Sequence, residues 1–326
     1  MRYSREEFDL ASRNLETAAL LSAEISKKFT AQLQTAVPET QKEKKSYTLI
    51  FVGDIMLSRK IDKLMNESRD FRFPFLKISE TLRSADFTFG NLEGPISDRG
   101  RNQGSKFSFR VDPEAVEGLK FAGFDMVSLA NNHILDWGVE ALAQTVSILH
   151  ANGIKSVGAG RNYTEANNPV FAEIGNTKIA FFAYTNFYPE NLLATENRGG
   201  VSSFNLEEIK ANIKNARSRT DLVVVSLHWG DEYKLRSSPT QQGIAHALIE
   251  AGADLIVGHH PHVAQEVERY KDGWILYSLG NFVFDQYLWD ETKKGLMAKV
   301  TLEDKKISSL ELKTVKLNGT FQPYIE

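Results

Sequence analysis

Five apolar segments of the chain are followed directly by residues with carboxylate, amide or imidazole side chains. This pattern constrains the fold more than any other feature. Several of them are apolar over consecutive residues, which is typical of strands covered on both faces. α/β proteins place their sites at the carboxyl ends of such strands, so these ends are candidates for one shared site. The segments with their polar ends span residues 51–54, 88–93, 127–133, 223–228 and 255–262.

Strands and helices alternate from Tyr47 to Gly258, whereas only strands are expected beyond Gly258. A plain doubly wound domain would leave these C-terminal strands unexplained. Two sheets packed face to face, with helices outside, satisfy both parts of the chain. Helices are expected at Pro74–Arg83, Pro113–Phe121, Val139–Ala151, Leu206–Ser218 and Gln241–Glu250. Antiparallel strands are expected at Val263–Tyr270, Trp274–Tyr277, Gly295–Leu302 and Ile307–Leu317.

Residues 1–46 differ from the rest and predict an N-terminal helical arm and linker, which leaves residues 47–326 as the main domain. Apolar residues recur at helical spacing from Ser4 to Lys28. Residues Thr35 to Lys45 are polar and charged, which favours a linker. A solvated arm is the favoured interpretation, and an oligomerisation or anchoring helix is the alternative.

The chain of 326 residues has a formal net charge of -3 and contains no cysteine. This charge gives no general attraction to nucleic acid, and the lack of cysteine excludes disulfides, thiolate catalysis and cysteine-based zinc sites. The apolar run from Ala18 to Ala23 is too short for the core of a signal peptide. We expect either a cytoplasmic protein or an extracytoplasmic, membrane-associated one whose anchor is missing from this sequence.

Carboxylates follow two of the strands. Asp54 comes directly after Gly53, and Glu93 lies between a strand and a Gly-Pro pair. A lone Gly-Asp is usually a helix or turn cap, so for Asp54 capping and function are equally favoured. Glu93 stands in a position too tight for a merely solvated side chain.

Amide and imidazole groups end the other strands. Asn132 and His133 follow an apolar strand, and His228 ends the most apolar strand of the chain. Asp136 comes three residues after His133. It suits either an N-cap for the helix that follows or a hydrogen bond that fixes the tautomer of the His133 ring.

Three histidines lie together between Gly258 and Val263. In an extended chain the side chains of residues i and i+2 point to the same side, so His260 and His262 are expected to face one point. His259 is then expected to face away from that point and to be structural.

The strand ends together supply two carboxylates, one amide oxygen and three imidazoles. This set suits Mn²⁺, Zn²⁺ or Fe²⁺, and shared carboxylates are typical of two-metal hydrolases. The same residues could also exchange protons without a metal. The candidate ligands are Asp54, Glu93, Asn132, His228, His260 and His262.

Six motifs in a fixed order carry a resemblance to a known family. They are Gly-Asp-Ile-Met, Asn-Leu-Glu-Gly, Ala-Asn-Asn-His, His-Trp-Gly-Asp-Glu-Tyr, Gly-His-His-Pro-His and Tyr-Ser-Leu-Gly-Asn-Phe-Val-Phe-Asp. Over residues 47–290 the chain resembles the CapA family of poly-γ-glutamate and capsule synthesis, which looks like a branch of the calcineurin-like metallophosphoesterase superfamily. The resemblance implies a four-layer α/β/β/α sandwich of two mixed sheets, with the site at the sheet edges.

The resemblance also implies roles for single residues. Glu93 stands where the superfamily has its bridging aspartate, Asp54 matches the first ligand, and His133 matches the donor to the transition state. Met56 departs from the superfamily, which has histidine there. One metal position thus loses a nitrogen ligand that a thioether does not replace for a hard ion, although CapA-like proteins share this methionine.

Polar residues in the neighbouring loops are candidates for binding a carboxylate-rich ligand such as a glutamyl polymer. For each of them singly, a solvated loop charge is the simpler interpretation. The candidates are Lys106, Arg110, Arg161, Glu232, Tyr233 and Asn281, with Asp285 beside the last motif.

We therefore expect a CapA-like protein of capsular polymer biosynthesis with a metallophosphoesterase-type site. Either one or two metals support hydrolysis, or Glu93, His133 and Asp136 act as acid and base on a peptide-like or phosphorylated substrate with metal weak or absent. The alternative is a non-catalytic subunit that binds the polymer or assembles with membrane synthase subunits, so enzymatic activity stays an open question at this point.

Overall fold

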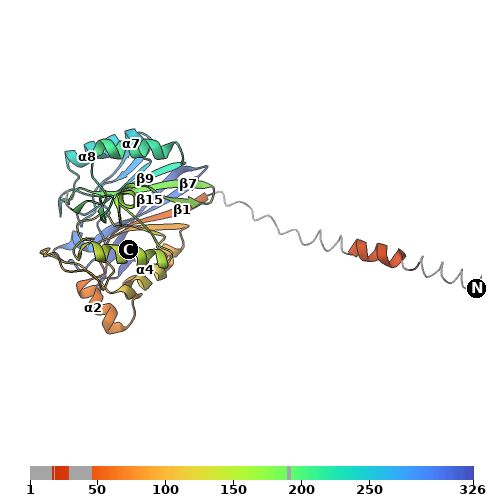
Figure 1. Cartoon of the computed structure of the whole chain (residues 1–326), viewed down its shortest axis with the longest axis horizontal. Coiled ribbons are helices and arrows are strands. Elements are labelled where there is room, and N and C mark those ends of the chain that lie inside the picture. The colour runs from red at the N-terminus through yellow and green to blue at the C-terminus, as the bar shows by residue number, and fades with distance from the viewer. Residues whose placement is uncertain (1–16, 18, 29–45, 189–191) are drawn as a thin grey trace, which may run out of the picture. The chain divides into compact units, whose positions relative to one another are not determined.

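The computed structural model describes residues 17, 19–28, 46–188 and 192–326 (Figure 1). The chain divides into two compact units, Met1–Lys44 and Lys45–Glu326. In the first unit, residues 17 and 19–28 are helical and exposed, and the rest of the predicted helix and the predicted linker lie outside the described residues. Across the described ranges, no helix has both the length and the apolarity needed to cross a membrane.

The first sheet of the second unit contains eight strands in the order β16-β15-β14-β1-β2-β3-β4, with β13 paired to β1. Strands β1 to β4 are parallel, and β14, β15 and β16 are antiparallel to their neighbours. The strands are β1 (Ser46–Ile55), β2 (Phe87–Leu92), β3 (Met126–Ser128), β4 (Lys155–Val157), β13 (Asn281–Val283), β14 (Lys294–Glu303), β15 (Lys306–Leu317) and β16 (Pro323–Ile325).

The second sheet contains six strands in the order β11-β12-β10-β9-β7-β6. Its inner strands are parallel, whereas β6 and β11 run antiparallel at the two edges. The strands are β6 (Val170–Ile174), β7 (Thr177–Thr185), β9 (Leu222–His228), β10 (Leu255–His259), β11 (Val267–Tyr270) and β12 (Gly273–Leu276). A separate pair is formed by β5 (Ala159–Gly160) and β8 (Gly200–Val201).

The four strands expected after Gly258 form the antiparallel pairs β11–β12 and β14–β15, but two parallel pairings in this part of the chain were not predicted. After β10 the chain crosses to the sheet edge as β11 and returns in a hairpin, so β12 runs parallel to β10. Strand β13 pairs in parallel with the end of β1. Both differences arise because strand direction depends on where the chain crosses between positions in the sheet.

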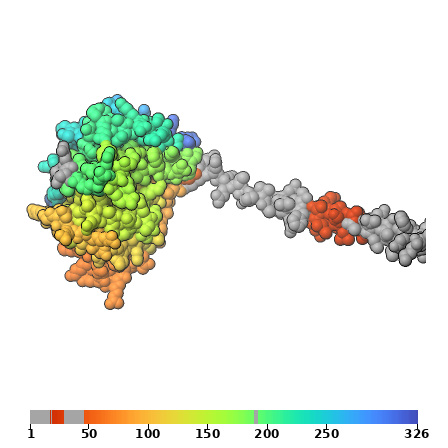
Figure 2. All heavy atoms as spheres, viewed as in Figure 1, coloured from red at the N-terminus to blue at the C-terminus, as the bar shows by residue number. Residues whose placement is uncertain are grey.

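Helices cover the outer faces of both sheets (Figure 1). The predicted helix at Pro74–Arg83 is divided into a 3₁₀ turn, Phe73–Phe75, and the short helix α3. Helices α2 and α6 were not expected from the sequence, and Figure 2 shows α2 (orange) protruding from the surface. The helices are α2 (Arg59–Ser68), α3 (Ser79–Arg83), α4 (Val116–Ala122), α5 (Gly138–Ala151), α6 (Tyr163–Asn167), α7 (Leu206–Arg217) and α8 (Pro239–Ala251).

Three apolar cores separate the layers. Alternate residues of β1 enter different cores, since side chains along a strand point to opposite faces. Leu49 and Phe51 pack between the two sheets, whereas Ile50 and Val52 pack against the helices of the first sheet. A third core lies between β9 and helices α7 and α8. The order is therefore helices, sheet, sheet, helices, which confirms the predicted four-layer sandwich.

Phe181 anchors the core between the sheets. Its ring stacks on Phe87 and Phe89 of the opposite sheet, with centroids 5.1 and 5.8 Å apart. We expect Phe181→Leu to lower the free energy of unfolding by about 1–2 kcal/mol, because aromatic pairing and shape are lost while most apolar contact remains. Urea unfolding measures this, with the exposed Leu312→Ala as control; equal losses in both variants would contradict it.

The carboxyl ends of the parallel strands from both sheets meet at one edge. The bulge after Phe51 turns Asp54 into register with Asn91 of β2 and Asn281 of β13. Gly53 is required there, because a Cβ at this position would lie 1.9 Å from the carbonyl oxygen of Gly280. The fold thus gathers residues from distant motifs around the end of β1.

Candidate metal centre

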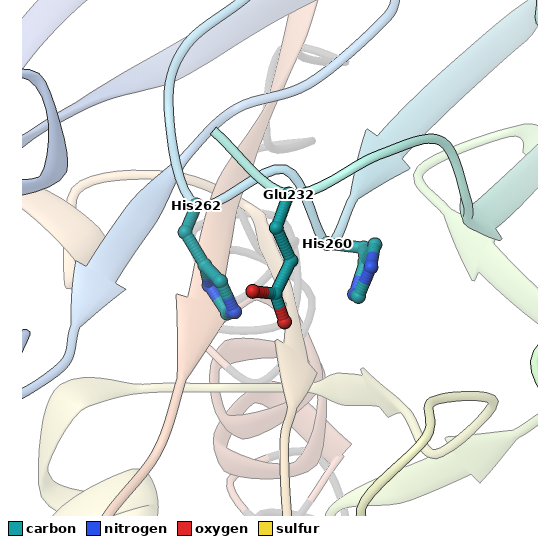
Figure 3. Close-up of side chains that lie close together, drawn as sticks. All are labelled: Glu232, His260 and His262. Carbon is teal, nitrogen blue, oxygen red and sulfur yellow. The ribbon is translucent and has the colours of Figure 1, made fainter. Parts of the chain in front are cut away.

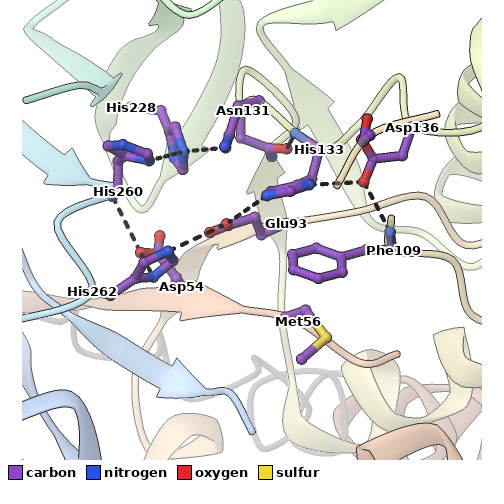
Figure 4. A network of polar contacts seen from close by, with 12 residues as sticks. Asp54, Met56, Glu93, Phe109, Asn131, His133, Asp136, His228, His260 and His262 are labelled. Carbon is purple, nitrogen blue, oxygen red and sulfur yellow. Dashed lines mark hydrogen bonds and ion pairs between the residues drawn. The ribbon is translucent and has the colours of Figure 1, made fainter. Parts of the chain in front are cut away.

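Asp54 is the centre of a buried polar network (Figure 4). Its Oδ1 accepts a hydrogen bond from Asn91 Nδ2 at 2.9 Å, and its Oδ2 accepts one from the His260 backbone N–H at 3.2 Å. Burial by itself raises the pKa of Asp54, but His259, His262 and Asn91 outweigh burial and lower it. Asp54 is therefore held as a carboxylate, and it does not cap a helix.

Glu93 is buried beside Asp54 with neither carboxylate oxygen hydrogen-bonded within the described part of the chain. Its Oε1 lies 3.9 Å from Nε2 of both His133 and His262. Burial, followed by the charges of Asp54 and Glu232, raises the pKa of Glu93 well above its ordinary value. A buried carboxylate without partners is costly, so this position requires either a proton or a cation.

His260 and His262 reach the same region from the loop after β10. Burial lowers the pKa of His260 to about 3 and also lowers the pKa of His262, so both rings are neutral. His262 Nδ1 lies 3.0 Å from Asn281 Oδ1 and donates to it, which leaves Nε2 with a free lone pair toward Glu93. A neutral ring oriented in this way is the form that binds metal ions.

The expectation that His259 faces away from the site is wrong. Its Nδ1 lies 3.4 Å from Asp54 Oδ1, in a fully buried position. An extended backbone would turn His259 away, but His260 and His262 have φ angles of 98° and 57°. The chain therefore turns at each of these residues, which brings the His259 and His262 rings near Asp54 and the His260 ring near His228.

His228 is connected to the site through Asn91 and Asn132. Asn91 Nδ2 lies 3.3 Å from His228 Nδ1, and His228 Nε2 lies 2.8 Å from Asn132 Oδ1. The His260 Nδ1 atom is 3.1 Å from the same Nε2. Burial, with the neighbouring imidazoles, holds the pKa of His228 well below its ordinary value. Asn91, which was not among the predicted site residues, thus connects Asp54 to His228.

His133 and Asp136 form a hydrogen-bonded pair on the other side of Glu93. His133 Nδ1 donates to Asp136 Oδ2 at 2.8 Å, and the same oxygen accepts from the Phe109 backbone N–H at 2.8 Å. Ser105 Oγ donates to the other oxygen. Asp136 therefore orients the imidazole, and the His133 Nε2 atom faces Glu93. Of the two interpretations of Asp136, the geometry favours the one with His133, since the helix α5 begins without a side-chain cap.

Met56 takes no part in this network. Its side chain is buried in the core between the first sheet and its helices, and its sulfur accepts hydrogen bonds from Ser58 N and Ser58 Oγ at 3.2 and 2.9 Å. The thioether is thus engaged away from the ligand cluster, and position 56 supplies no ligand.

Among the described residues, two groups of side chains are close enough to hold a metal ion. In each group the candidate ligand atoms lie within 4.8 Å of one another, and His262 belongs to both. One group is buried and consists of Asp54, Glu93 and His262. The other joins His260 and His262 to the exposed Glu232 (Figure 3). A divalent ion fits here, because it would supply the partner that the buried Glu93 carboxylate lacks.

The predicted ligand-binding residues lie in different surroundings. Asn281 is buried and orients His262, so the structure gives it a supporting position. Tyr233 lies against the site, with its backbone N–H bonded to Pro261 O at 2.8 Å. Arg161 is exposed and paired with Glu165 at 2.6 Å.

Two further candidates lie on the loop that follows Glu93. Arg110 lies over the Trp137 ring at 3.5 Å, and Lys106 is exposed over Phe107. These contacts do not involve the six candidate ligands, so the roles of Arg110 and Lys106 in binding stay predictions.

Arg59 is a site cation that the sequence reasoning missed. It opens α2 with a φ of 58°, pairs with the buried Asp285 and lies 5.0 Å over the Phe109 ring. Burial lowers the pKa of Arg59, while the negative charge of Glu93 opposes this shift. Only its position three residues after Met56, the end of the Gly-Asp-Ile-Met motif, could have indicated it.

Several known proteins are similar to this chain. A family model described as bacterial capsule synthesis protein PGA_cap matches residues 48–286. Capsule biosynthesis protein CapA of Bacillus anthracis is 34% identical over 287 residues, covering 86% of this chain and 69% of that protein. PGA biosynthesis protein CapA of Bacillus subtilis is 32% identical over 271 residues, covering 82% and 71%.

The fold also has a counterpart among solved structures. The crystal structure of a phosphatase from Mycoplasma pneumoniae matches with a TM-score of 0.51 and 14% identity, covering 83% of this chain and 94% of that one. At this identity the likeness concerns the fold alone, which is the metallophosphoesterase-like sandwich expected from the sequence.

Proposed function

The chain belongs to the PGA_cap family of bacterial capsule synthesis proteins, and we propose that it is a metal-dependent hydrolase that cleaves an anionic, peptide-like glutamyl polymer during capsule synthesis. The observation that carries this proposal is the buried Glu93 carboxylate, which lies between Asp54, His262 and His133 and has no hydrogen bond from the part of the chain that the structure describes. A purely structural core would not retain such a group, because it costs stability unless a cation binds there.

The ion would be held by Asp54, Glu93 and His262, with His260 beside them. When bound, a divalent ion supplies Lewis-acid polarisation of the scissile group and lowers the pKa of water. Oxygen and imidazole ligands suit Mn²⁺, Fe²⁺ or Zn²⁺. Because Met56 is packed in the core, we propose one ion per chain.

His133 is proposed to move the proton. Asp136 fixes its Nδ1–H, so the Nε2 lone pair faces the site and can accept or return a proton at the reacting group. The centroid of the Phe109 ring lies 4.0 Å from the centroid of the His133 imidazole, and the Phe109 ring limits the access of water from that side. This arrangement is that of a general acid or base oriented by a carboxylate.

Arg59 is proposed to bind a carboxylate of the polymer. Its side chain is partly exposed, and Asp285 fixes it next to the metal cluster. We expect Arg59→Ala to raise KM about tenfold with little change in kcat, since a charge-assisted hydrogen bond is worth roughly 1.5–3 kcal/mol. Arg161→Ala is the matched control, because the Arg161 side chain is exposed and its ion pair with Glu165 involves none of the candidate ligands. Equal KM changes in both variants would contradict this assignment.

The test of the proposed function uses the full chain with Mn²⁺, Fe²⁺ or Zn²⁺. Poly-γ-glutamate is incubated with the protein, and its chain length is followed by size-exclusion chromatography, with bis(p-nitrophenyl) phosphate as the phosphoester comparison. Metal-dependent shortening of the polymer supports the proposal. Cleavage of the phosphoester alone, or of neither compound, contradicts the proposed substrate.

A second function is favoured by one specific observation, the missing ligand at position 56. Under this alternative the chain binds glutamyl polymer without cleaving it and works with membrane synthase subunits at the cell surface. Polymer binding that is unaffected by EDTA, together with no shortening, would favour this alternative over hydrolysis.

A further inference from the structure

Glu232 lies on the loop that follows β9, across from the histidine turn. Figure 3 shows its carboxylate directed toward His260 and His262, and candidate ligand atoms of the three residues lie within 4.8 Å of one another. The motif resemblance implies no role in metal binding for Glu232. It implies a histidine ligand at position 56, where this chain has Met56. Glu232 is exposed, so its position here needs a structural cause.

The loop that carries Glu232 is tied to the histidine turn on both sides. Before it, Trp229 N–H donates to His259 O at 3.1 Å; directly after it, Tyr233 N–H donates to Pro261 O at 2.8 Å. Tyr233 adopts a φ of 64°, a conformation that is uncommon for a bulky residue. These two bonds hold the Glu232 backbone at a fixed place relative to the histidines.

The charge of Glu232 also acts on the buried group. It helps to raise the pKa of Glu93, after burial and Asp54, and it partly offsets the lowering of the His262 pKa by burial. Without a cation, Glu232 therefore destabilises the ionised form of Glu93. A cation bound by these residues would offset this unfavourable effect.

We propose that Glu232 is a direct ligand of the metal ion, supplying from the loop after β9 the ligand that Met56 does not supply. The inference rests on the proposed metal dependence and extends it. The group of Glu232 and His260 shares His262 with the buried group of Asp54 and Glu93, so Glu232 adds a carboxylate to the donor set around His262. Such a set favours a hard ion, and Mn²⁺ is the expected ion.

The test compares Glu232→Gln with Asp231→Asn in the full chain. Asp231 is exposed and adjacent, so its variant removes the same charge from the same loop without removing the proposed ligand. Calorimetric titration with Mn²⁺ is expected to give one ion per chain for the native protein, an affinity lowered on the order of tenfold or more in Glu232→Gln, and little change in Asp231→Asn. Visible absorption of bound Co²⁺, which reports the coordination sphere, is expected to change only in Glu232→Gln.

Each outcome separates the inference from the proposed function. Equal affinity losses in both variants, or an unchanged affinity and Co²⁺ spectrum in Glu232→Gln, would overturn the role of Glu232 and leave the metal site in place. A native protein that binds neither Mn²⁺ nor Co²⁺ would overturn the proposed metal dependence itself. Circular dichroism of both variants verifies that the loop substitutions leave the fold intact.

Discussion

Replacing Glu93 by glutamine is expected to abolish Mn²⁺ binding and, with it, hydrolysis. The substitution removes one negative charge from the buried group of Asp54, Glu93 and His262 while keeping the side-chain shape. In the native protein, Mn²⁺ at a hundred times its dissociation constant stabilises the fold by about 2.7 kcal/mol. This stabilisation is expected to vanish in Glu93→Gln, as measured by urea unfolding with Mn²⁺ and with EDTA.

The metal-free variant is expected to be at least as stable as the metal-free native protein. Glu93 is buried without hydrogen bonds among the described residues and lies near the charge of Asp54, so glutamine relieves a repulsion there. The gain in the free energy of unfolding is limited to about 1 kcal/mol, because the glutamine amide also lacks hydrogen-bond partners among the described residues. Glu173→Gln, at an exposed position, serves as control. It should change neither the stabilisation by Mn²⁺ nor the stability of the metal-free protein. Retained Mn²⁺ stabilisation in Glu93→Gln would exclude Glu93 as a ligand.

Replacing His133 by alanine is expected to lower kcat by about 10²–10⁴-fold while Mn²⁺ affinity changes little. The imidazole is hydrogen-bonded to Asp136 and turns its Nε2 toward the site, so its loss removes proton transfer and leaves the proposed ligands in place. Polymer cleavage under saturating Mn²⁺ measures kcat, and calorimetry measures the affinity.

Asp136→Asn separates orientation from proton transfer. An amide cannot accept the His133 Nδ1–H through its nitrogen, and it also disturbs the bonds from Phe109 N and Ser105 Oγ. We expect a fall in kcat that is smaller than or equal to that of His133→Ala, without a change in KM. The exposed His150→Ala is the control for loss of an imidazole. Unchanged kcat in His133→Ala would show that the reaction does not use this proton carrier.

Local patterns were sufficient for much of the fold. Strands β7 and β9 and helices α5, α7 and α8 lie close to their predicted positions, because long apolar runs and helical periodicity report burial directly. Helix α2 was missed although its buried residues, Ile61 and Met65, stand four positions apart, a helical spacing that could have indicated it. The parallel pairing of β12 with β10 was missed because crossovers between strand positions leave no local mark in the sequence.

The sequence by itself determined which chemical groups stand at the strand ends, because each apolar run places the next polar residue at a sheet edge. Asp54, Glu93, His133 and His228 could therefore be assigned to one site in advance. The resemblance of the six motifs added the family and the expected sandwich, both of which the comparisons support.

The tertiary structure alone decided where the side chains point. His259 turns toward Asp54, and Met56 turns into the core, because backbone turns and packing override the alternation of an extended chain. The contact between Asp54 and the His260 backbone joins residues 206 positions apart, and no local pattern records such a contact. For the same reason, the positions of Arg59 and Glu232 became visible only when the strand ends of both sheets were brought to one edge.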